Sequence, residues 1–151
     1  MKKRTKISRE SFASWTEVSI RYSDLDPNGH VNNGAINQYF EDGRVKFRED
    51  LMGGLGREIL TGFAIAHFEV SYYSALNYPG SVEVGTVVTR IGETSFGLGQ
   101  AIFVGSREIA GAHVVSVYFD PATGKKKHLP DELRTVLKKA LLEPQIGTKL
   151  S

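Results

Sequence analysis

The chain has 151 residues, of which 40% are hydrophobic and 24% are charged, and it contains no cysteine. This length is typical of one compact domain that can bury a substantial core. The lack of cysteine excludes a disulfide-stapled fold, a thiol nucleophile and a cysteine zinc site.

Charge is distributed unevenly along the chain. The 19 Lys and Arg residues exceed the 17 Asp and Glu residues by two, but the first ten residues alone carry a net charge of +4. The remaining 141 residues therefore carry a net charge of −2, which does not indicate a nucleic-acid-binding surface. We predict a basic N-terminal tail over residues 1–14, a single domain over residues 15–145 and a C-terminal tail over residues 146–151.

Hydrophobic residues occur only in short runs. The longest runs are the four-residue segments Phe63–Ala66 and Ala101–Val104, which are far too short for a membrane-spanning helix. The basic residues near the start are not followed by the apolar segment of a signal peptide. With no cysteine and no such segment, we expect a cytoplasmic protein without a membrane span.

The first half of the chain predicts a strand, a loop and a long helix. Apolar residues alternate over Thr16–Tyr22, and Ser23–Asn33 is rich in turn-forming residues. Apolar residues then recur at helical spacing over Gly34–Met52, and Gly53 and Gly54 follow as a stop signal. Gly43 inside this helix costs about 1 kcal/mol relative to Ala, so we expect that this helix face approaches a sheet closely.

The second half predicts four more strands and a final helix. The strands are separated by short turns, which indicates antiparallel pairing, and they span Phe63–Ala75, Ser81–Ile91, Ser95–Val104 and Ile109–Phe119. A short helix is predicted to start at Pro130. We therefore predict an α+β fold in which a five-stranded antiparallel sheet covers one long helix.

Two ion pairs are expected on the long helix. Asp42 and Lys46 are separated by four residues, and Glu41 and Arg44 by three. Glu41 lies about 12 Å along the helix from its start, at 1.5 Å per residue. A direct carboxylate pair between Glu41 and Asp26 in the preceding loop is therefore not expected.

Asp26, Asn28 and His30 stand at alternate positions in the loop before the long helix. The first N–H groups of a helix carry partial positive charge and can stabilise an oxyanion. Asp26 could act as a general base or nucleophile, His30 as a base or orienting group, and Asn28 as a hydrogen-bonding partner. The same residue types also form ordinary turns and helix caps, so a purely structural interpretation stays open.

The segment YSDLDPNGHVNNGAINQYFEDGR, residues 22–44, resembles the signature of hotdog-fold acyl-CoA thioesterases of the 4-hydroxybenzoyl-CoA thioesterase-like group. It is also similar to the Asp-x-Asn-x-His-x-Asn-Asn segment of plant acyl-ACP thioesterases. The resemblance implies a sheet wrapped around a central helix, Asp26 as the catalytic carboxylate, and the Asn33 backbone N–H as a donor to the thioester carbonyl. The acyl-ACP version adds Asn28 and His30 to the site.

The sequence departs from this signature at two helix positions. Ile36 stands where Tyr is common, and Gly43 precedes Arg44. Because both positions lie on the helix, we expect them to bear on the choice of acyl chain rather than on the reaction.

The predicted function is hydrolysis of acyl-CoA to the free acid and coenzyme A. Coenzyme A is part of the substrate, so no separate cofactor is expected. The alternatives are an acyl-ACP thioesterase, a hotdog enoyl-CoA hydratase and a non-catalytic acyl-CoA-binding module. His67 and His113 fall within predicted strands without metal-site spacing, so no metal site is expected.

Basic residues could bind the coenzyme A phosphates at two places. One is Arg90 with Ser95 across the predicted hairpin, and the other is the run Lys125, Lys126 and Lys127. A solvated charged turn is the alternative for the lysines. The resemblance implies a homodimer or homotetramer with the active site at the subunit interface, and an edge strand of the sheet would also need a partner.

Overall fold

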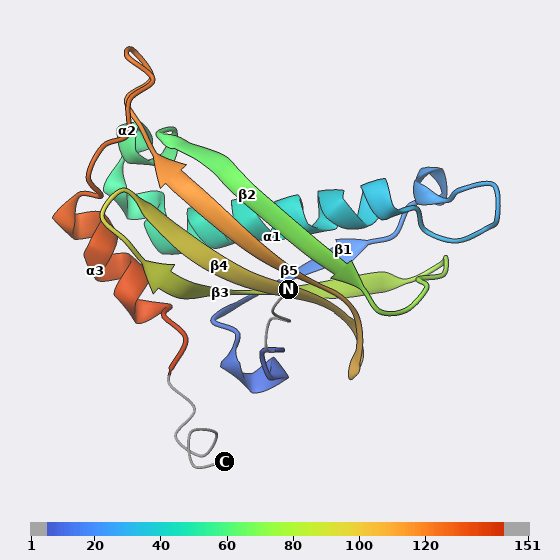
Figure 1. Cartoon of the computed structure of the whole chain (residues 1–151). Coiled ribbons are helices and arrows are strands. Elements are labelled where there is room, and N and C mark those ends of the chain that lie inside the picture. The colour runs from blue at the N-terminus through green and yellow to red at the C-terminus, as the bar shows by residue number, and fades with distance from the viewer. Residues whose placement is uncertain (1–5, 144–151) are drawn as a thin grey trace.

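The computed structural model describes residues 6–143 and confirms the predicted α+β architecture (Figure 1). One five-stranded antiparallel sheet, in the order β1-β3-β4-β5-β2, curves around a long helix. The strands are β1 (Ser14–Ser19), β2 (Phe63–Tyr72), β3 (Ser81–Ile91), β4 (Ser95–Val104) and β5 (Arg107–Tyr118). The helices are α1 (Asn33–Met52), α2 (Arg57–Leu60) and α3 (Asp131–Lys139), with short 3-10 turns η1 (Arg9–Ser11), η2 (Tyr22–Asp24) and η3 (Gly53–Leu55).

Helix α1 lies along the inner face of the sheet and buries one side there. The side-chain oxygen of Asn32 accepts a hydrogen bond of 2.7 Å from the Ala35 N–H and caps the helix start. The buried residues follow the predicted helical spacing and are Ile36, Tyr39, Phe40, Gly43, Phe47 and Met52. The core therefore sits between α1 and the sheet.

Gly43 is the point of closest approach between α1 and the sheet. A Cβ at this position would lie 2.6 Å from Cγ1 of Val84, which is fully buried on β3. Such a contact is well inside van der Waals range, so only glycine fits without a shift of the sheet. The predicted reason for a glycine within the helix is confirmed.

A buried polar side chain, Gln100 on β4, lies at the same contact. Its amide nitrogen donates to the Phe40 carbonyl at 3.0 Å and to the Thr86 hydroxyl at 3.1 Å. Its amide oxygen accepts a 3.1 Å hydrogen bond from Arg44. Every polar atom of the Gln100 amide is thus engaged, which offsets the cost of burying it.

Neither ion pair expected on α1 forms. Arg44 turns inward to Gln100 and lies over the Phe68 ring, with 5.3 Å between guanidinium and ring centroid. Glu41 instead accepts a hydrogen bond from Gln38. Asp42 also does not pair with Lys46, because Lys46 contacts Asp50, one turn further on, at 3.1 Å.

The edge strands differ from the predicted ranges. Strand β1 begins and ends earlier than expected, and Tyr22 falls in η2 with 74% of its surface exposed. Strand β2 has an irregular register between Ile65 and His67. This irregularity interrupts the alternation, so Phe68 packs against the core while Ala66 is exposed.

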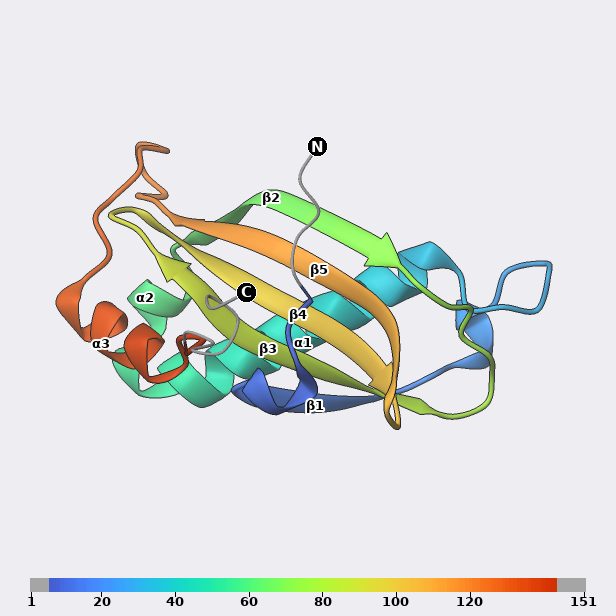
Figure 2. The ribbon, with the colours of Figure 1, turned by 60° about the horizontal axis from the view of Figure 1, so that its bottom comes forward.

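Residues 6–13, which the sequence places in the basic tail, pack against the outer face of the sheet (Figure 2). Phe12 is buried and lies over Gly85, where a Cβ would come within 2.7 Å of its ring. Arg9 forms a 2.6 Å ion pair with Glu83. Glycine on the sheet thus makes room for this segment, which packs against the sheet and does not extend into solvent. Residues 1–5 and 146–151 of the predicted tails lie outside the described residues.

Replacing Gly43 by Ala is expected to lower the free energy of unfolding by about 1–2 kcal/mol, because overpacking of a core costs about 1–3 kcal/mol and exceeds the gain in helix propensity. Urea denaturation measures the change. Gly54→Ala is the matched control, since a Cβ there meets nothing within 4 Å; it should shift stability by less than about 0.5 kcal/mol. Equal stability of Gly43→Ala and wild type would show that the helix has room to move.

Candidate functional site

The loop before α1 is closed at its base by backbone hydrogen bonds. The Asn32 N–H donates to the Asp24 carbonyl at 3.0 Å, and the Val31 N–H donates to the Leu76 carbonyl at 2.9 Å. The backbone of His30 also forms an isolated antiparallel β-bridge with Asn77 in the segment before β3. The loop therefore projects from the end of the molecule where α1 begins (Figure 1), with both of its ends held by the scaffold.

The carboxylate of Asp26 is oriented by the loop itself. Its Oδ1 atom accepts hydrogen bonds from the N–H groups of Asn28, at 2.9 Å, and His30, at 3.2 Å. The turn is completed by Gly29, whose φ of +82° suits a residue without a Cβ. No donor among residues 6–143 contacts Oδ2, so this oxygen can approach a water molecule or a substrate carbon.

The other predicted site residues here, Asn28, His30 and Asn33, are exposed. The side chains of Asn28 and His30 form no hydrogen bond with residues 6–143, and each contributes its backbone N–H to Asp26. Asn33 begins α1 with an exposed side chain. Asp26, Asn28 and His30 thus share one loop, and Asn33 follows that loop as the first residue of α1.

The start of α1 offers two backbone donors. The Ala35 N–H donates to the Asn32 side chain and the Ile36 N–H to the Asn32 carbonyl. The N–H groups of Asn33 and Gly34 have no acceptor in the described part of the chain, as expected for the first turn of a helix. A cleft of about 620 Å³ opens beside this turn; Gly34 and Asp24 line it, whereas Asp26 and Asn33 do not. Two free donors at a helix start are suited to hold a developing oxyanion.

Asp24 and Tyr39 form a buried hydrogen bond at the base of the loop, to which sequence reasoning assigned no role. The Tyr39 hydroxyl donates to Asp24 Oδ2 at 2.5 Å, and the Arg21 N–H donates to the same atom at 2.9 Å. Burial raises the pKa of Asp24, but these two hydrogen bonds and the nearby Arg21 charge outweigh it and hold that pKa below the ordinary value. Burial and the bond to Asp24 raise the pKa of Tyr39.

The residues predicted to bind coenzyme A phosphates lie at the other end of the sheet. Arg90 donates to the Ser95 hydroxyl at 3.1 Å across the β3–β4 hairpin. Lys125, Lys126 and Lys127 are exposed in the loop after β5, and Lys127 lies over the Tyr118 ring at 5.0 Å. Strand β3 runs from beside the Asp26 loop to this hairpin, a span of about 30 Å at 3.3 Å per residue. The structure does not bring these cations to the Asp26 loop of the same chain (Figure 1).

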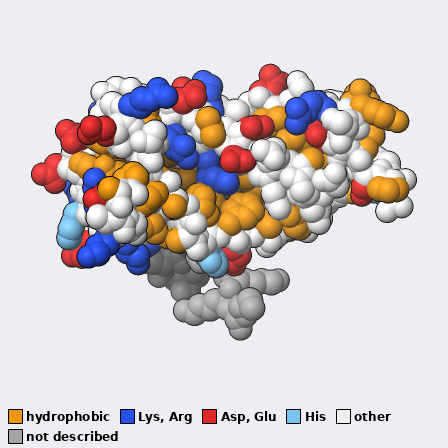
Figure 3. All heavy atoms as spheres, turned by 90° about the horizontal axis from the view of Figure 1, so that it is seen from above, with side chains coloured by type: hydrophobic (Ala, Val, Ile, Leu, Met, Phe, Trp, Pro, Cys, Tyr) orange, Lys and Arg blue, Asp and Glu red, His pale blue; other side chains and the backbone are white. Residues whose placement is uncertain are grey.

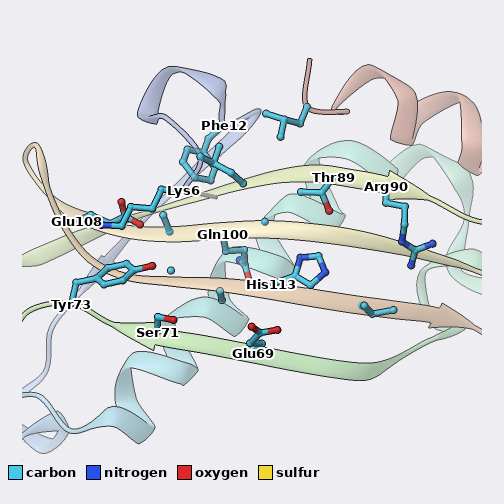
Figure 4. Close-up of a pocket in the computed structure, with 17 residues that line it drawn as sticks. Lys6, Phe12, Glu69, Ser71, Tyr73, Thr89, Arg90, Gln100, Glu108 and His113 are labelled. Atoms are coloured by element: carbon cyan, nitrogen blue, oxygen red, sulfur yellow. The ribbon is translucent and has the colours of Figure 1, made fainter. Parts of the chain in front are cut away.

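A second hollow, of about 920 Å³, lies on the outer face of the sheet (Figure 4). Lys6 from the N-terminal segment borders it and lies 3.9 Å from the centre of the Tyr73 ring. Burial raises the pKa of Glu108 nearby. Of the predicted site residues only Arg90 lines this hollow, so it is separate from the Asp26 loop.

Two further features concern the described residues as a whole. Within residues 6–143, no group of three or more His, Asp or Glu side chains is placed to hold a metal ion. In the same part of the chain, no helix has both the length and the apolar character needed to cross a membrane.

Comparisons with known proteins agree with the fold. A predicted thioesterase from Bacillus stearothermophilus is 29% identical, with a TM-score of 0.78 over 87% of this chain and 98% of that one. A thioesterase from Thermus thermophilus, solved in complex with coenzyme A and Zn, is 26% identical, with a TM-score of 0.76 over 87% and 96% of the two chains. A 1,4-dihydroxy-2-naphthoyl-CoA thioesterase from Synechocystis shares the fold at 16% identity, with a TM-score of 0.71 over 82% and 94%. A search of curated protein sequences finds no match.

The family model of the thioesterase-like superfamily matches residues 20–137, which include the Asp26 loop, α1 and all strands except β1. The fold is the hotdog fold, as predicted from the resemblance. The chain is therefore a member of the thioesterase-like superfamily.

Proposed function

We propose that this protein hydrolyses an acyl-CoA thioester to the free acid and coenzyme A. The observation that carries the proposal is the placement of Asp26 in the loop that leads into the start of α1, where two backbone N–H groups are free of acceptors among the described residues. The family supports thioester hydrolysis in general. A relative solved with coenzyme A supports coenzyme A as the carrier.

The loop supplies the elements of acyl transfer to water. Asp26 Oδ2 either activates a water molecule as a general base or attacks the thioester carbonyl as a nucleophile, and both routes fit its free position. The N–H groups of Asn33 and Gly34 stabilise the oxyanion that forms on the carbonyl oxygen. In the general-base route, the proton taken from water passes through the carboxyl group to the departing thiolate, and the thiol and the acid are released. In the nucleophilic route, Asp26 forms a mixed anhydride with the acyl group as the C–S bond breaks and the thiolate departs; water then hydrolyses the anhydride, which releases the acid, restores the Asp26 carboxylate and supplies the proton that the thiolate takes up.

Asp26→Asn is expected to lower kcat for acyl-CoA hydrolysis by at least about 100-fold, because the amide can neither accept a proton nor attack. The release of thiol, followed with a thiol-reactive dye over short, long and aromatic acyl-CoAs, measures the effect. Asn28→Ala is expected to retain more activity, since Asn28 holds Asp26 through its backbone N–H. Equal turnover by Asp26→Asn and wild type would contradict the assignment of Asp26. With an enoyl-CoA as substrate, loss of enoyl absorbance without thiol release would indicate a hydratase.

The oxyanion role of the Asn33 N–H can be tested by removing that group alone. Proline is favourable at the first position of a helix, and Asn32 has φ −74° and ψ 158°, which a following proline tolerates. Asn33→Pro is therefore expected to leave the fold intact and lower kcat by about 100- to 1,000-fold. Asn33→Ala keeps the N–H group and should retain most activity. Similar kcat values for the two variants would show that this N–H does not contact the carbonyl oxygen.

We also propose that two copies associate through β2. This strand is an edge of the sheet, pairs only with β5 among the described strands, and carries the exposed residues Ile65 and Tyr72. Figure 3 shows hydrophobic side chains gathered on this side of the molecule, with charged ones among them. A ten-residue unpaired edge is a template for a second strand.

Light scattering at micromolar concentration is expected to give twice the chain mass of 16.7 kDa, or four times if two dimers associate further. Ile65→Lys on the β2 edge should raise the dimer dissociation constant by at least about 10-fold, because it places a charge in the contact. Leu141→Lys is the control, since Leu141 is similarly exposed but lies beyond α3. A wild-type monomer at these concentrations would contradict the proposed association.

A further inference from the structure

We propose that Asp24 and Tyr39 are positioning residues that hold the loop of residues 24–32, and with it Asp26, in register with the start of α1. The inference rests on the proposed function, because the position of Asp26 matters only if Asp26 reacts. Neither Asp24 nor Tyr39 contacts the proposed reacting atoms; both act through the loop backbone.

Asp24 is a buried charged residue at the base of a surface loop. Only 7% of it is exposed. A carboxylate in such a place is costly unless it is hydrogen-bonded, and Asp24 Oδ2 receives the Tyr39 O–H at 2.5 Å and the Arg21 N–H at 2.9 Å. The Arg21 guanidinium adds a weaker contact, 3.7 Å from Oδ1.

Tyr39 connects the Asp24 carboxylate to the packed core. It lies almost two turns inside α1, is 1% exposed, and belongs to the core cluster that includes Phe40 and Ile102. Among residues 6–143, Asp24 is the one hydrogen-bond partner of its hydroxyl. The hydrogen bond therefore joins the packed interior of α1 to the loop.

Asp24 is also the residue on which the loop closes. Its carbonyl accepts the N–H of Asn32, the cap of α1, while its side chain contacts Tyr39. Asp24 is thus hydrogen-bonded to α1 at two positions along the helix, at the N-cap residue Asn32 and at Tyr39 in its second turn. Two such contacts fix the direction in which the chain leaves Asp24, and Asp26 follows two residues later. Loss of the Tyr39 contact would leave the backbone hydrogen bond from Asn32 as the remaining contact between Asp24 and the start of α1.

The effect of losing the Tyr39 contact falls on the chemical step. A misplacement of about 1 Å at a reacting group can lower a rate by about 100-fold. Substrate binding depends on other surfaces, so KM should change little. This split between kcat and KM distinguishes positioning of Asp26 from a general loss of folded protein.

Tyr39→Phe is the direct test, and Tyr118→Phe is the matched control. Tyr118 is also buried, at 4% exposure, but its hydroxyl contacts no carboxylate in the described part of the chain and it lies at the opposite end of the sheet. Tyr39→Phe is expected to lower kcat for acyl-CoA by about 10- to 100-fold with KM within about twofold of wild type. Tyr118→Phe should leave both parameters within about twofold. Equal effects of the two variants on kcat would overturn the proposal.

A second pair of variants tests Asp24 itself. In Asp24→Asn the amide oxygen can still accept from Tyr39 and from the Arg21 N–H, whereas Asp24→Ala has no acceptor. Asp24→Asn is therefore expected to keep at least about fivefold more kcat than Asp24→Ala. Circular dichroism confirms that each variant is folded before its rate is compared. Equal rates for two folded variants would exclude a role for the hydrogen bond.

The pH profile gives a further readout. The charged groups that face the pair are Arg21 on Asp24, and Arg21 and Asp42 on Tyr39. The hydrogen bond from Tyr39 helps to keep the pKa of Asp24 low, so it favours the ionised carboxylate and weakens as the pH falls through that pKa. Tyr39→Phe lacks this hydrogen bond at every pH, so its deficit in kcat relative to wild type is expected to be largest above that pKa and to narrow as the pH falls through it. A deficit that stays the same across this pH range counts against the pair.

Hydrogen exchange separates this inference from the proposed function. In Tyr39→Phe the N–H groups of Asp26, Gly29 and Asn32 are expected to exchange at least about 10-fold faster, while those in the middle of α1 keep their protection. If wild type hydrolyses no thioester, the proposed function fails, and the exchange result still decides whether the pair orders the loop. Unchanged exchange in the loop would overturn the positioning role whatever the activity.

Discussion

The close contact between α1 and the sheet at Gly43 is the constraint on which the rest of the structure depends. A side chain there would meet Val84, so glycine allows the helix to lie deep in the curve of the sheet. At this depth the helix also brings its Phe40 carbonyl to Gln100. The contact thereby sets the distance from α1 to β3 and β4, the strands that carry Val84 and Gln100. Because the Asp26 loop is attached to the start of the same helix, its position depends on this contact.

Polar groups within the core add direction to this packing. Apolar contacts are non-directional, whereas Gln100 is satisfied in only one arrangement of Phe40, Thr86 and Arg44. The hydrogen bond between Tyr39 and Asp24 has the same character nearer the start of α1. A buried polar group that loses its partner is costly, so both contacts favour one register of helix, sheet and loop. The structure is in this sense fixed at two points along one helix.

Local patterns in the sequence predict the elements and the Asp26 loop well, because turn residues, helical spacing and alternation are local properties. They do not predict where charged side chains find partners. Glu41 and Arg44 have the spacing of an ion pair, yet Arg44 turns to Gln100, which is 56 residues away in the sequence. Tyr39 looks like one more apolar residue of the buried face, and only the fold shows that its hydroxyl meets Asp24. The packing of residues 6–13 over Gly85 and Gly99 is likewise a contact between distant segments.

The distance between the two groups of predicted site residues bears on how many copies form a working enzyme. The Asp26 loop and the β3–β4 hairpin with Arg90 lie at opposite ends of a strand about 30 Å long. If these cations hold the phosphates of the acyl-CoA that Asp26 attacks, they must come from another copy of the chain. Association through β2, as proposed, would join two sheets along an edge. If the two β2 strands pair antiparallel, the end of the partner's sheet that carries these cations would lie beside the end that carries the Asp26 loop. The unpaired edge and the separation of the two groups are independent features, and the same dimer would account for both.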